Sequence, residues 1–149
     1  ELAVACDIRI AAENAAMGMP PAKLGLVYHY LGLKRFLRIL GFARTLEMFL
    51  TGRNYGSAEC LAMGLVNHLV DAASLEETVY ELASEVAKHA PLALKGTKRI
   101  LYRMAEYPEI GKEDEALFRD LFLRSLKSRD LEEGKRAFRE RRTPQFKGR

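Results

Sequence analysis

The sequence has 149 residues, of which 48% are hydrophobic and 30% are charged, and its formal net charge is +4. These proportions are typical of a soluble globular protein, and the length suits one domain that buries roughly 70% of its unfolded surface. No apolar stretch approaches the ~18–20 residues that span a bilayer, and no signal-peptide pattern is present, so we expect a cytoplasmic protein without a membrane partner.

The cysteines and histidines show neither a disulfide pattern nor a metal-binding pattern. Cys6 and Cys60 are far apart and neither belongs to a C-x-x-C pair, which predicts two buried free thiols. His29, His68 and His89 lack the spacing of metal ligands. We therefore expect no metal site.

The first half of the chain combines short strands with helices. Leu2 to Ala11 is rich in aliphatic residues and predicts a largely buried strand. A chain that opens inside an apolar run without methionine is also expected to be a fragment. The following segments are predicted in order: a strand at Ala15–Met19, helix at Gly32–Gly41 and Arg44–Leu50, a short helix at Ser57–Met63 capped by Ser57, and an edge strand at Leu65–Val70.

The second half is predicted to be helical. Helices are expected from Ser74, from Pro91 to about Ala105, from Glu113 to about Leu126, and from a cap made by Asp130 and Glu133 to a stop at Pro144. No linker or internal repeat separates these segments. Strands followed by a long helical tail are therefore the expected organisation.

The segment from Gly18 to His29 is the most distinctive in the chain. Pro20 and Pro21 remove two backbone donors, so a preceding strand must stop there, and Gly25 permits a turn. Tyr28 adds a polar hydroxyl among apolar neighbours, and a rigid strand exit of this kind often carries functional groups. The alternative interpretation is a strand-to-helix loop with a half-buried tyrosine.

Glu1 is the second polar residue in apolar surroundings. A buried carboxylate is costly unless it is protonated or paired, which invites a functional hypothesis, although the first residue can equally be an exposed stub. No second carboxylate stands beside Pro20 and Pro21. The sequence therefore contains no obvious pair of acidic residues for acid–base catalysis.

Several spaced motifs occur in a fixed order along the whole chain. They are Glu1-Leu2-Ala3-x-x-Cys6-Asp7-Ile8-Arg9-Ile10-Ala11, Pro20-x-x-x-Leu24-Gly25, Leu50-Thr51-Gly52-Arg53, Ala62-x-Gly64-Leu65-Val66-Asn67, Ala90-Pro91, and the run from Glu133 to Gly148. This order resembles the crotonase (enoyl-CoA hydratase/isomerase) superfamily. The resemblance implies an α/β fold, with the C-terminal part of a crotonase-like ββα spiral over residues 1–72 and a helical trimerisation region over residues 73–149.

The resemblance also implies a chemistry. Members of the family bind acyl-CoA thioesters and stabilise an enolate with two backbone amides, which are expected to precede Glu1. Coenzyme A is then part of the substrate, no separate cofactor is expected, and a homotrimer or a hexamer is implied. In hydratases Glu1 would share the activation of water with a second glutamate, but Pro21 stands at that position and cannot transfer a proton.

The pattern Leu24-Gly25-x-x-Tyr28-x-x-x-Gly32 resembles methylmalonyl-CoA decarboxylase-like members of the superfamily. In that branch the tyrosine holds the carboxylate of the substrate, so the resemblance implies that Tyr28 orients this group for loss of CO2, with Glu1 as a second catalytic candidate. The implied substrate-binding residues are Pro20, Pro21, Leu24, Gly25 and Val27, with Phe146 and Lys147 near the CoA nucleotide.

Three alternatives remain open at this point. Hydration or isomerisation of an enoyl-CoA is the first, and a purely packing role for Tyr28 is the second. A non-catalytic RNA-binding or scaffolding role is the third, suggested by the basic charge. Nucleic acid is not the expected partner, because the basic residues alternate with acids and lack accompanying aromatic side chains for stacking.

Overall fold

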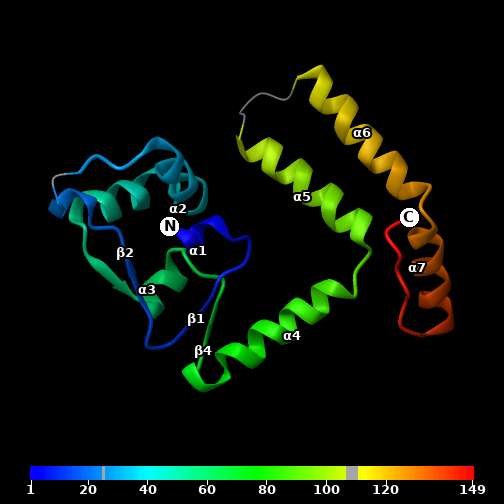
Figure 1. The fold of residues 1–149 in the computed structure, drawn as a ribbon, viewed down its shortest axis with the longest axis horizontal. Helices are drawn as coiled ribbons and strands as arrows, with labels where there is room; N and C mark the ends of the chain where they lie inside the picture. Colours follow the sequence, from blue (N-terminus) through cyan, green and yellow to red (C-terminus); the bar gives the residue numbers. More distant parts are fainter. Residues whose placement is uncertain (25, 107–110) are drawn as a thin grey trace. The chain divides into compact units, whose positions relative to one another are not determined.

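The computed structural model describes residues 1–24, 26–106 and 111–149, and the chain divides into two units, Glu1–Tyr80 and Glu81–Arg149 (Figure 1). The family resemblance implies a different boundary, between the spiral at residues 1–72 and the helical region at residues 73–149. That boundary stays a prediction. Each unit is described by itself below.

The first unit contains the strands. Its elements are α1 (Leu2–Ala5), β1 (Ile10–Ala12), β2 (Ala16–Gly18), the 3₁₀ helix η1 (Pro21–Leu24), α2 (Tyr30–Thr51), β3 (Asn54–Gly56), α3 (Ser57–Ala62), β4 (His68–Val70), the 3₁₀ helix η2 (Ala72–Ser74) and the start of α4 (Leu75–Ala87). β1 pairs with β4 in parallel, and β2 pairs with β3 in antiparallel orientation. A parallel pair requires a long crossover, and here the crossover contains α2 and α3.

The predicted strand from Leu2 to Ala11 is only partly correct. Residues Leu2–Ala5 form helix α1, and the strand is confined to Ile10–Ala12. An aliphatic run does not by itself distinguish a strand from a helix. In α1 only Val4 is buried, whereas Leu2 is 83% exposed, so a single side chain anchors this turn to the core.

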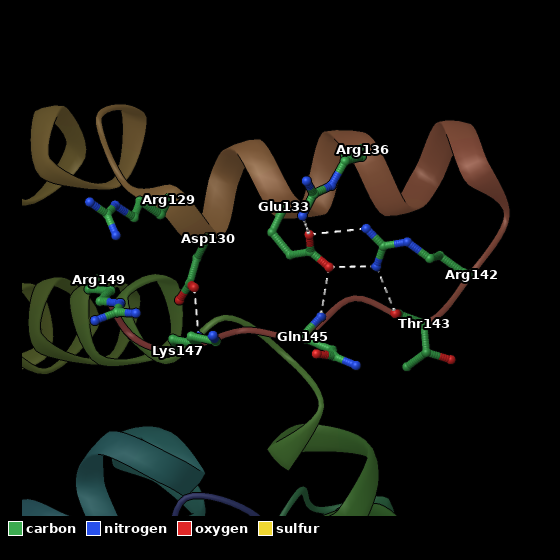
Figure 2. Close-up of a pocket in the computed structure, with 9 residues that line it drawn as sticks. All are labelled: Arg129, Asp130, Glu133, Arg136, Arg142, Thr143, Gln145, Lys147 and Arg149. Atoms are coloured by element: carbon green, nitrogen blue, oxygen red, sulfur yellow. Dashed lines mark hydrogen bonds and ion pairs between the residues drawn. The ribbon is translucent and has the colours of Figure 1, made fainter.

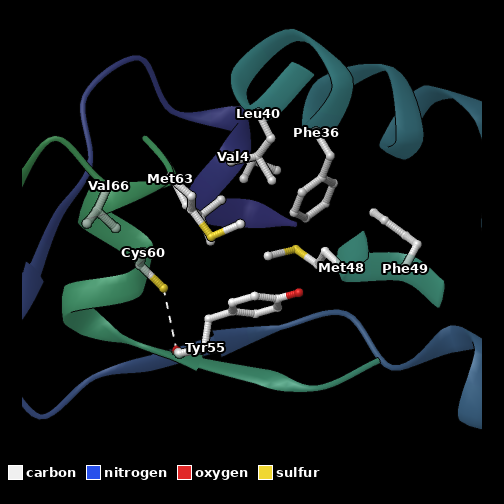
Figure 3. Packing of buried hydrophobic residues seen from close by; sticks show 10 residues of the cluster. Val4, Phe36, Leu40, Met48, Phe49, Tyr55, Cys60, Met63 and Val66 are labelled. Carbon is white, nitrogen blue, oxygen red and sulfur yellow. Dashed lines mark hydrogen bonds between the residues drawn. The ribbon is translucent and has the colours of Figure 1, made fainter. Parts of the chain in front are cut away.

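The hydrophobic core of the first unit lies between α1, α2, α3 and the β2–β3 pair (Figure 3). Its buried members are Val4, Phe36, Leu40, Met48, Phe49, Tyr55, Cys60, Met63, Leu65 and Val66. The rings of Phe36 and Phe49 meet edge to face, with 5.1 Å between their centroids. Cys60 is buried, as predicted, but Cys6 is exposed in the bend after α1, so the prediction of two buried thiols is wrong for Cys6.

Glycine interrupts and ends helix α2. Gly41 has φ 72° and ψ 175°, which is non-helical and breaks the helix into two parts, and Gly52 ends it in the left-handed conformation. Both breaks were expected from the sequence, because residues other than glycine adopt positive φ only at a cost.

The short helix α3 begins differently from the prediction. Gly56, not Ser57, is its N-cap, and the carboxylate of Glu59 accepts the N–H of Gly56 at 3.0 Å. The hydroxyl of Ser57 instead donates to the backbone carbonyl of Glu13. Ser57 therefore ties α3 to the turn between β1 and β2.

The second unit consists of the end of α4 and the helices α5 (Pro91–Glu106), α6 (Lys112–Leu126) and α7 (Arg129–Glu140). The predicted helices at Pro91–Ala105 and Glu113–Leu126 are confirmed within one residue. The salt bridge from Arg103 to Asp114, 2.6 Å between Nε and Oδ1, links α5 to α6. The cap of α7 is Ser128, whose hydroxyl oxygen accepts the N–H of Leu131 at 3.1 Å.

Candidate active site

Three polar side chains of the first unit meet at the carboxylate of Glu1. The hydroxyl of Tyr28 donates to Oε2 of Glu1, and Nε2 of His29 lies 3.1 Å from the same oxygen. The guanidinium of Arg35 donates to the other oxygen, Oε1. Both candidate catalytic residues are thus in direct contact, and each carboxylate oxygen has a partner of its own. We call Glu1, Tyr28, His29 and Arg35 the Glu1 cluster.

The start of helix α2 positions three members of the Glu1 cluster. His29 is the N-cap of α2, Tyr28 precedes it, and Arg35 lies two turns along the helix from Tyr28. Helix α1 packs against α2, which brings Glu1 to the same place. Because Glu1 immediately precedes α1, its side chain lies close to the start of α2.

The ring of Tyr28 belongs to the edge of the core. Its centroid lies 5.5 Å from that of Phe49 and 4.6 Å from that of the His29 imidazole. Gly32 lies beneath this ring, where a Cβ atom would collide with it. Tyr28 is therefore both a packed aromatic residue and the donor of a polar hydroxyl, so the two interpretations of its role are compatible.

The contacts shift the protonation equilibria of the cluster. The hydrogen bonds from Tyr28 and His29, together with the charges of His29 and Arg35, lower the pKa of Glu1 from 4.5 to about 2. The hydrogen bond to the Glu1 carboxylate raises the pKa of Tyr28 above 10.0. At neutral pH Glu1 is thus a weakly basic carboxylate and Tyr28 keeps its proton.

Most of the apolar side chains predicted to bind substrate, in the loop from Pro20 to Val27, are exposed to solvent. Pro21 is buried, but Pro20 is exposed, Leu24 is 76% exposed and Val27 is 90% exposed. Gly25, the remaining predicted residue of the loop, lies outside the described residues. Within this chain the four described side chains thus do not close around a ligand, and their role in binding stays a prediction.

Sequence reasoning missed two members of the cluster. In the sequence, Arg35 is one of three neighbouring basic residues, with Lys34 and Arg38, and His29 is a histidine without metal-ligand spacing. The spacing of Tyr28 and Arg35 could have indicated their proximity, because residues seven positions apart lie on the same face of a helix. This spacing is informative only if α2 is known to begin at Tyr30 instead of Gly32.

The C-terminal residues 142–149 fold back along α7 in the second unit (Figure 2). Asp130, which is 3% exposed, accepts the backbone N–H groups of Lys147 and Gly148 at 2.7 Å each. Glu133 binds the guanidinium groups of Arg136 and Arg142. Asp130 and Glu133 therefore hold this segment, and the prediction that they cap α7 is wrong because both carboxylates are engaged with residues that follow the helix.

A cavity of about 440 Å³ lies between α7 and this segment (Figure 2). Its lining combines five cationic residues with two carboxylates and two polar residues: Arg129, Arg136, Arg142, Lys147, Arg149, Asp130, Glu133, Thr143 and Gln145. The contacts with Arg142 and Arg136 and the N–H of Gln145 hold the pKa of Glu133 well below its usual range. Lys147 thus lines a predominantly cationic cavity.

Phe146, the other residue predicted near the nucleotide, is half-buried and faces α7. A Cβ atom on Gly134 would lie 3.5 Å from its ring, which is ordinary van der Waals contact. The Phe146 ring therefore anchors the C-terminal segment on α7, and a contact with a nucleotide stays a prediction.

Neither a metal centre nor a membrane span is found in residues 1–24, 26–106 and 111–149. No three His, Cys, Asp or Glu side chains of this part are grouped so that they could hold a metal ion. None of its helices is both long and apolar enough to cross a membrane.

The fold matches solved structures over nearly the whole chain. An enoyl-CoA hydratase/carnithine racemase from Magnetospirillum magneticum superimposes with a TM-score of 0.91 at 33% identity, over 99% of this chain and 54% of that one. An enoyl-CoA hydratase from Bacillus anthracis superimposes with a TM-score of 0.91 at 31% identity, over 99% of this chain and 57% of that one. The chain thus has part of the crotonase fold, as the family resemblance implied.

Sequence comparison assigns the family. The sequence pattern of the enoyl-CoA hydratase/isomerase family matches residues 1–149. The chain is 39% identical, over 153 residues, to the carnitinyl-CoA dehydratases of Escherichia coli O157:H7 and of Salmonella typhi. The chain belongs to the enoyl-CoA hydratase/isomerase family. It is covered completely in these alignments and spans 58% of the length of each relative.

Proposed function

We propose that the full-length protein is an acyl-CoA enzyme that stabilises a thioester enolate and that its reaction is the decarboxylation of a malonyl-type acyl-CoA. Family membership supports the substrate class. The observation that carries the choice of reaction is the engagement of Glu1 by Tyr28, His29 and Arg35. A carboxylate held by three donors is a poor general base, and Pro21 replaces the second glutamate that hydration requires by the family resemblance.

Decarboxylation needs no general base. The hydroxyl of Tyr28 would donate to the free carboxylate of the substrate and hold its C–C bond perpendicular to the plane of the thioester. The bond then breaks, CO2 leaves, and the electron pair enters the thioester carbonyl to form the enolate. Two backbone amides outside this chain would stabilise the enolate oxygen, and a proton is added to the α-carbon afterwards.

The charge of the C-terminal segment supports the proposal that this segment contributes to the site for the CoA part of the substrate. The cationic cavity beside Lys147 has the charge that a nucleotide phosphate requires. We propose that Phe146 and Lys147 contribute to the site for the nucleotide, without a further cofactor, and that the full-length protein forms a trimer or a dimer of trimers. A cytoplasmic location belongs to the same proposal.

Hydration or dehydration is the second candidate, because the relatives at 39% identity are carnitinyl-CoA dehydratases. In this reaction Glu1 would act as the base and would first have to leave Arg35. The two candidates differ in their products, so one experiment separates them. The full-length protein is supplied with methylmalonyl-CoA or malonyl-CoA and CO2 release is measured, and in parallel with crotonyl-CoA, whose loss of absorbance reports hydration.

We expect CO2 release to be the faster reaction by at least about tenfold, a difference of 1.4 kcal/mol in activation free energy. Rapid hydration of crotonyl-CoA without CO2 release would contradict the proposal and favour the second candidate. RNA binding that weakens with salt and that CoA does not displace would favour the non-catalytic alternative.

A further inference from the structure

The two oxygens of Glu1 have different kinds of partners. Oε1 receives the charged guanidinium of Arg35, whereas Oε2 receives the hydroxyl of Tyr28 and the imidazole of His29. Two of these three donors can therefore hold Glu1 in place while the third turns away. Tyr28 is the donor that the proposed reaction needs elsewhere, because one hydroxyl can give its proton to only one carboxylate.

His29 binds Oε2 of Glu1 from the start of α2. Its Nδ1 accepts the backbone N–H of Gly32 at 3.2 Å, as the N-cap of α2. With Nδ1 as an acceptor, Nε2 is the ring nitrogen that donates to Glu1, 3.1 Å away. Arg35 contacts the other oxygen, Oε1, and its guanidinium supplies a positive charge that compensates this carboxylate.

We infer that Arg35 determines the substrate class of this site: it neutralises and retains Glu1, so that Tyr28 can turn its proton to an acyl group that ends in a free carboxylate. This inference rests on the proposed function, since it concerns the same hydroxyl. Without Arg35, an uncompensated Glu1 would repel the incoming carboxylate and compete with it for Tyr28. Arg35 is thus a positioning residue that acts through Glu1.

The size of the effect follows from Coulomb's law. Two carboxylates on either side of one hydroxyl lie about 6 Å apart. Their repulsion weakens binding about 3-fold at the dielectric constant of water and about 100-fold at an effective dielectric constant of 20. The Arg35 side chain is 41% exposed, which places the site between these limits. We expect a loss of about tenfold for a ligand with a carboxylate.

The test compares two ligands that cannot react. The 2-carboxyethyl thioether of coenzyme A keeps the carboxylate of a malonyl group but lacks the carbonyl that would accept electrons, and the propyl thioether is its uncharged counterpart. Dissociation constants are measured by titration calorimetry with the full-length protein. The variants are Arg35→Met, the double variant Arg35→Met/Glu1→Gln, and the control Arg38→Met, which changes an exposed arginine on the same helix.

We expect Arg35→Met to weaken the carboxyethyl ligand about tenfold and the propyl ligand less than about twofold. The double variant should regain most of the loss, because it removes the uncompensated charge, and Arg38→Met should bind both ligands like the original protein. Equal weakening of both ligands, an unchanged carboxyethyl affinity, or a double variant without recovery would each overturn the inference.

The same experiment separates this inference from the proposed reaction. If the full-length protein releases no CO2 but still loses its preference for the carboxyethyl ligand in Arg35→Met, the reaction is wrong and the role of Arg35 stands. If CO2 is released and Arg35→Met leaves that preference unchanged, the reaction stands and the role of Arg35 is wrong.

Discussion

Gly32 lies under the ring of Tyr28, where a methyl group does not fit. A Cβ atom at this position would be 3.0 Å from Cδ1 of Tyr28 and 3.1 Å from Cε1 of His29, and it would be closer still to Cε1 of Tyr28. The ring has little room to yield, because it packs on Phe49 and its hydroxyl is bonded to Glu1. The substitution Gly32→Ala should therefore displace the hydroxyl from the Glu1 cluster.

Two opposing effects set the magnitude. Replacing glycine with alanine inside a helix normally stabilises a protein by about 0.5–1 kcal/mol, because it removes backbone freedom from the unfolded chain. Overpacking against a fixed side chain costs about 1–3 kcal/mol. We expect Gly32→Ala to lower the free energy of unfolding by about 1 kcal/mol, the difference between the middles of these two ranges.

Gly96 provides a matched control on helix α5. A Cβ atom there would lie 3.9 Å from Cβ of Leu121, which is ordinary contact, so Gly96→Ala should be neutral or stabilising. Urea unfolding of the two variants of the full-length protein gives the difference in stability, and turnover gives the effect on the site. If Gly32→Ala stabilised the protein as much as Gly96→Ala and left turnover unchanged, the packing of Tyr28 described above would be wrong.

Three further changes test other parts of the structure. Asp130→Ala removes the acceptor of two hydrogen bonds from backbone amides, each worth about 1.5–3 kcal/mol. Hydrogen exchange at the amides of Lys147 and Gly148 should therefore accelerate about 10-fold or more. Unchanged exchange would refute the anchoring of the C-terminal segment by Asp130. Gly41→Ala should destabilise the protein by about 1–3 kcal/mol through backbone strain, since among the described residues no atom beyond the chain neighbours and the adjacent helix backbone lies within 4 Å of the new Cβ. A stability equal to that of the original would contradict this. The pKa of Glu1 in the folded protein is lowered from 4.5 to about 2, so the contribution of Glu1 to stability is present above pH 4.5 and is lost as the pH falls toward 2. The melting temperatures of the original protein and of Glu1→Gln should therefore converge over that interval. A difference that stays constant with pH would contradict this.

The sequence predicted helix ends best where a proline or a glycine restricts the backbone. Pro91 begins a helix and Gly41 and Gly52 interrupt or end one where expected, because these residues restrict the backbone regardless of what packs around them. The aliphatic run after Glu1 was assigned to the wrong element for the opposite reason. Its composition suits either a strand or a helix, and the choice depends on Val4 docking into a core built by later residues.

The capping predictions failed where side chains found distant partners. Ser57 satisfies the local signature of an N-cap, yet its hydroxyl bonds the carbonyl of Glu13, and Asp130 bonds amides that follow the helix it was expected to cap. Both partners are well separated in sequence, and a local pattern contains no information about them. The caps are instead Gly56, which precedes Ser57, and Ser128, two residues before Asp130.

The sequence indicated individual residues of the candidate site but not the contacts between them. The family pattern singled out Tyr28 and Glu1, and Pro21 argued against a pair of glutamates. Nothing in the sequence indicated that Glu1 would be the partner of Tyr28, because this contact depends on α1 packing against α2. Arg35 became a candidate only when the start of α2 was known.

The most direct test of the proposed function removes one oxygen atom. Tyr28→Phe in the full-length protein keeps the ring that packs on Phe49 and deletes the hydroxyl, and Tyr30→Phe makes the same change at an exposed residue at the start of α2. We predict that Tyr28→Phe lowers turnover of a malonyl-type thioester at least about 100-fold, which corresponds to about 2.7 kcal/mol of transition-state stabilisation, while Tyr30→Phe changes it less than about twofold. Turnover by Tyr28→Phe equal to that of the original protein would contradict the proposed role of the hydroxyl.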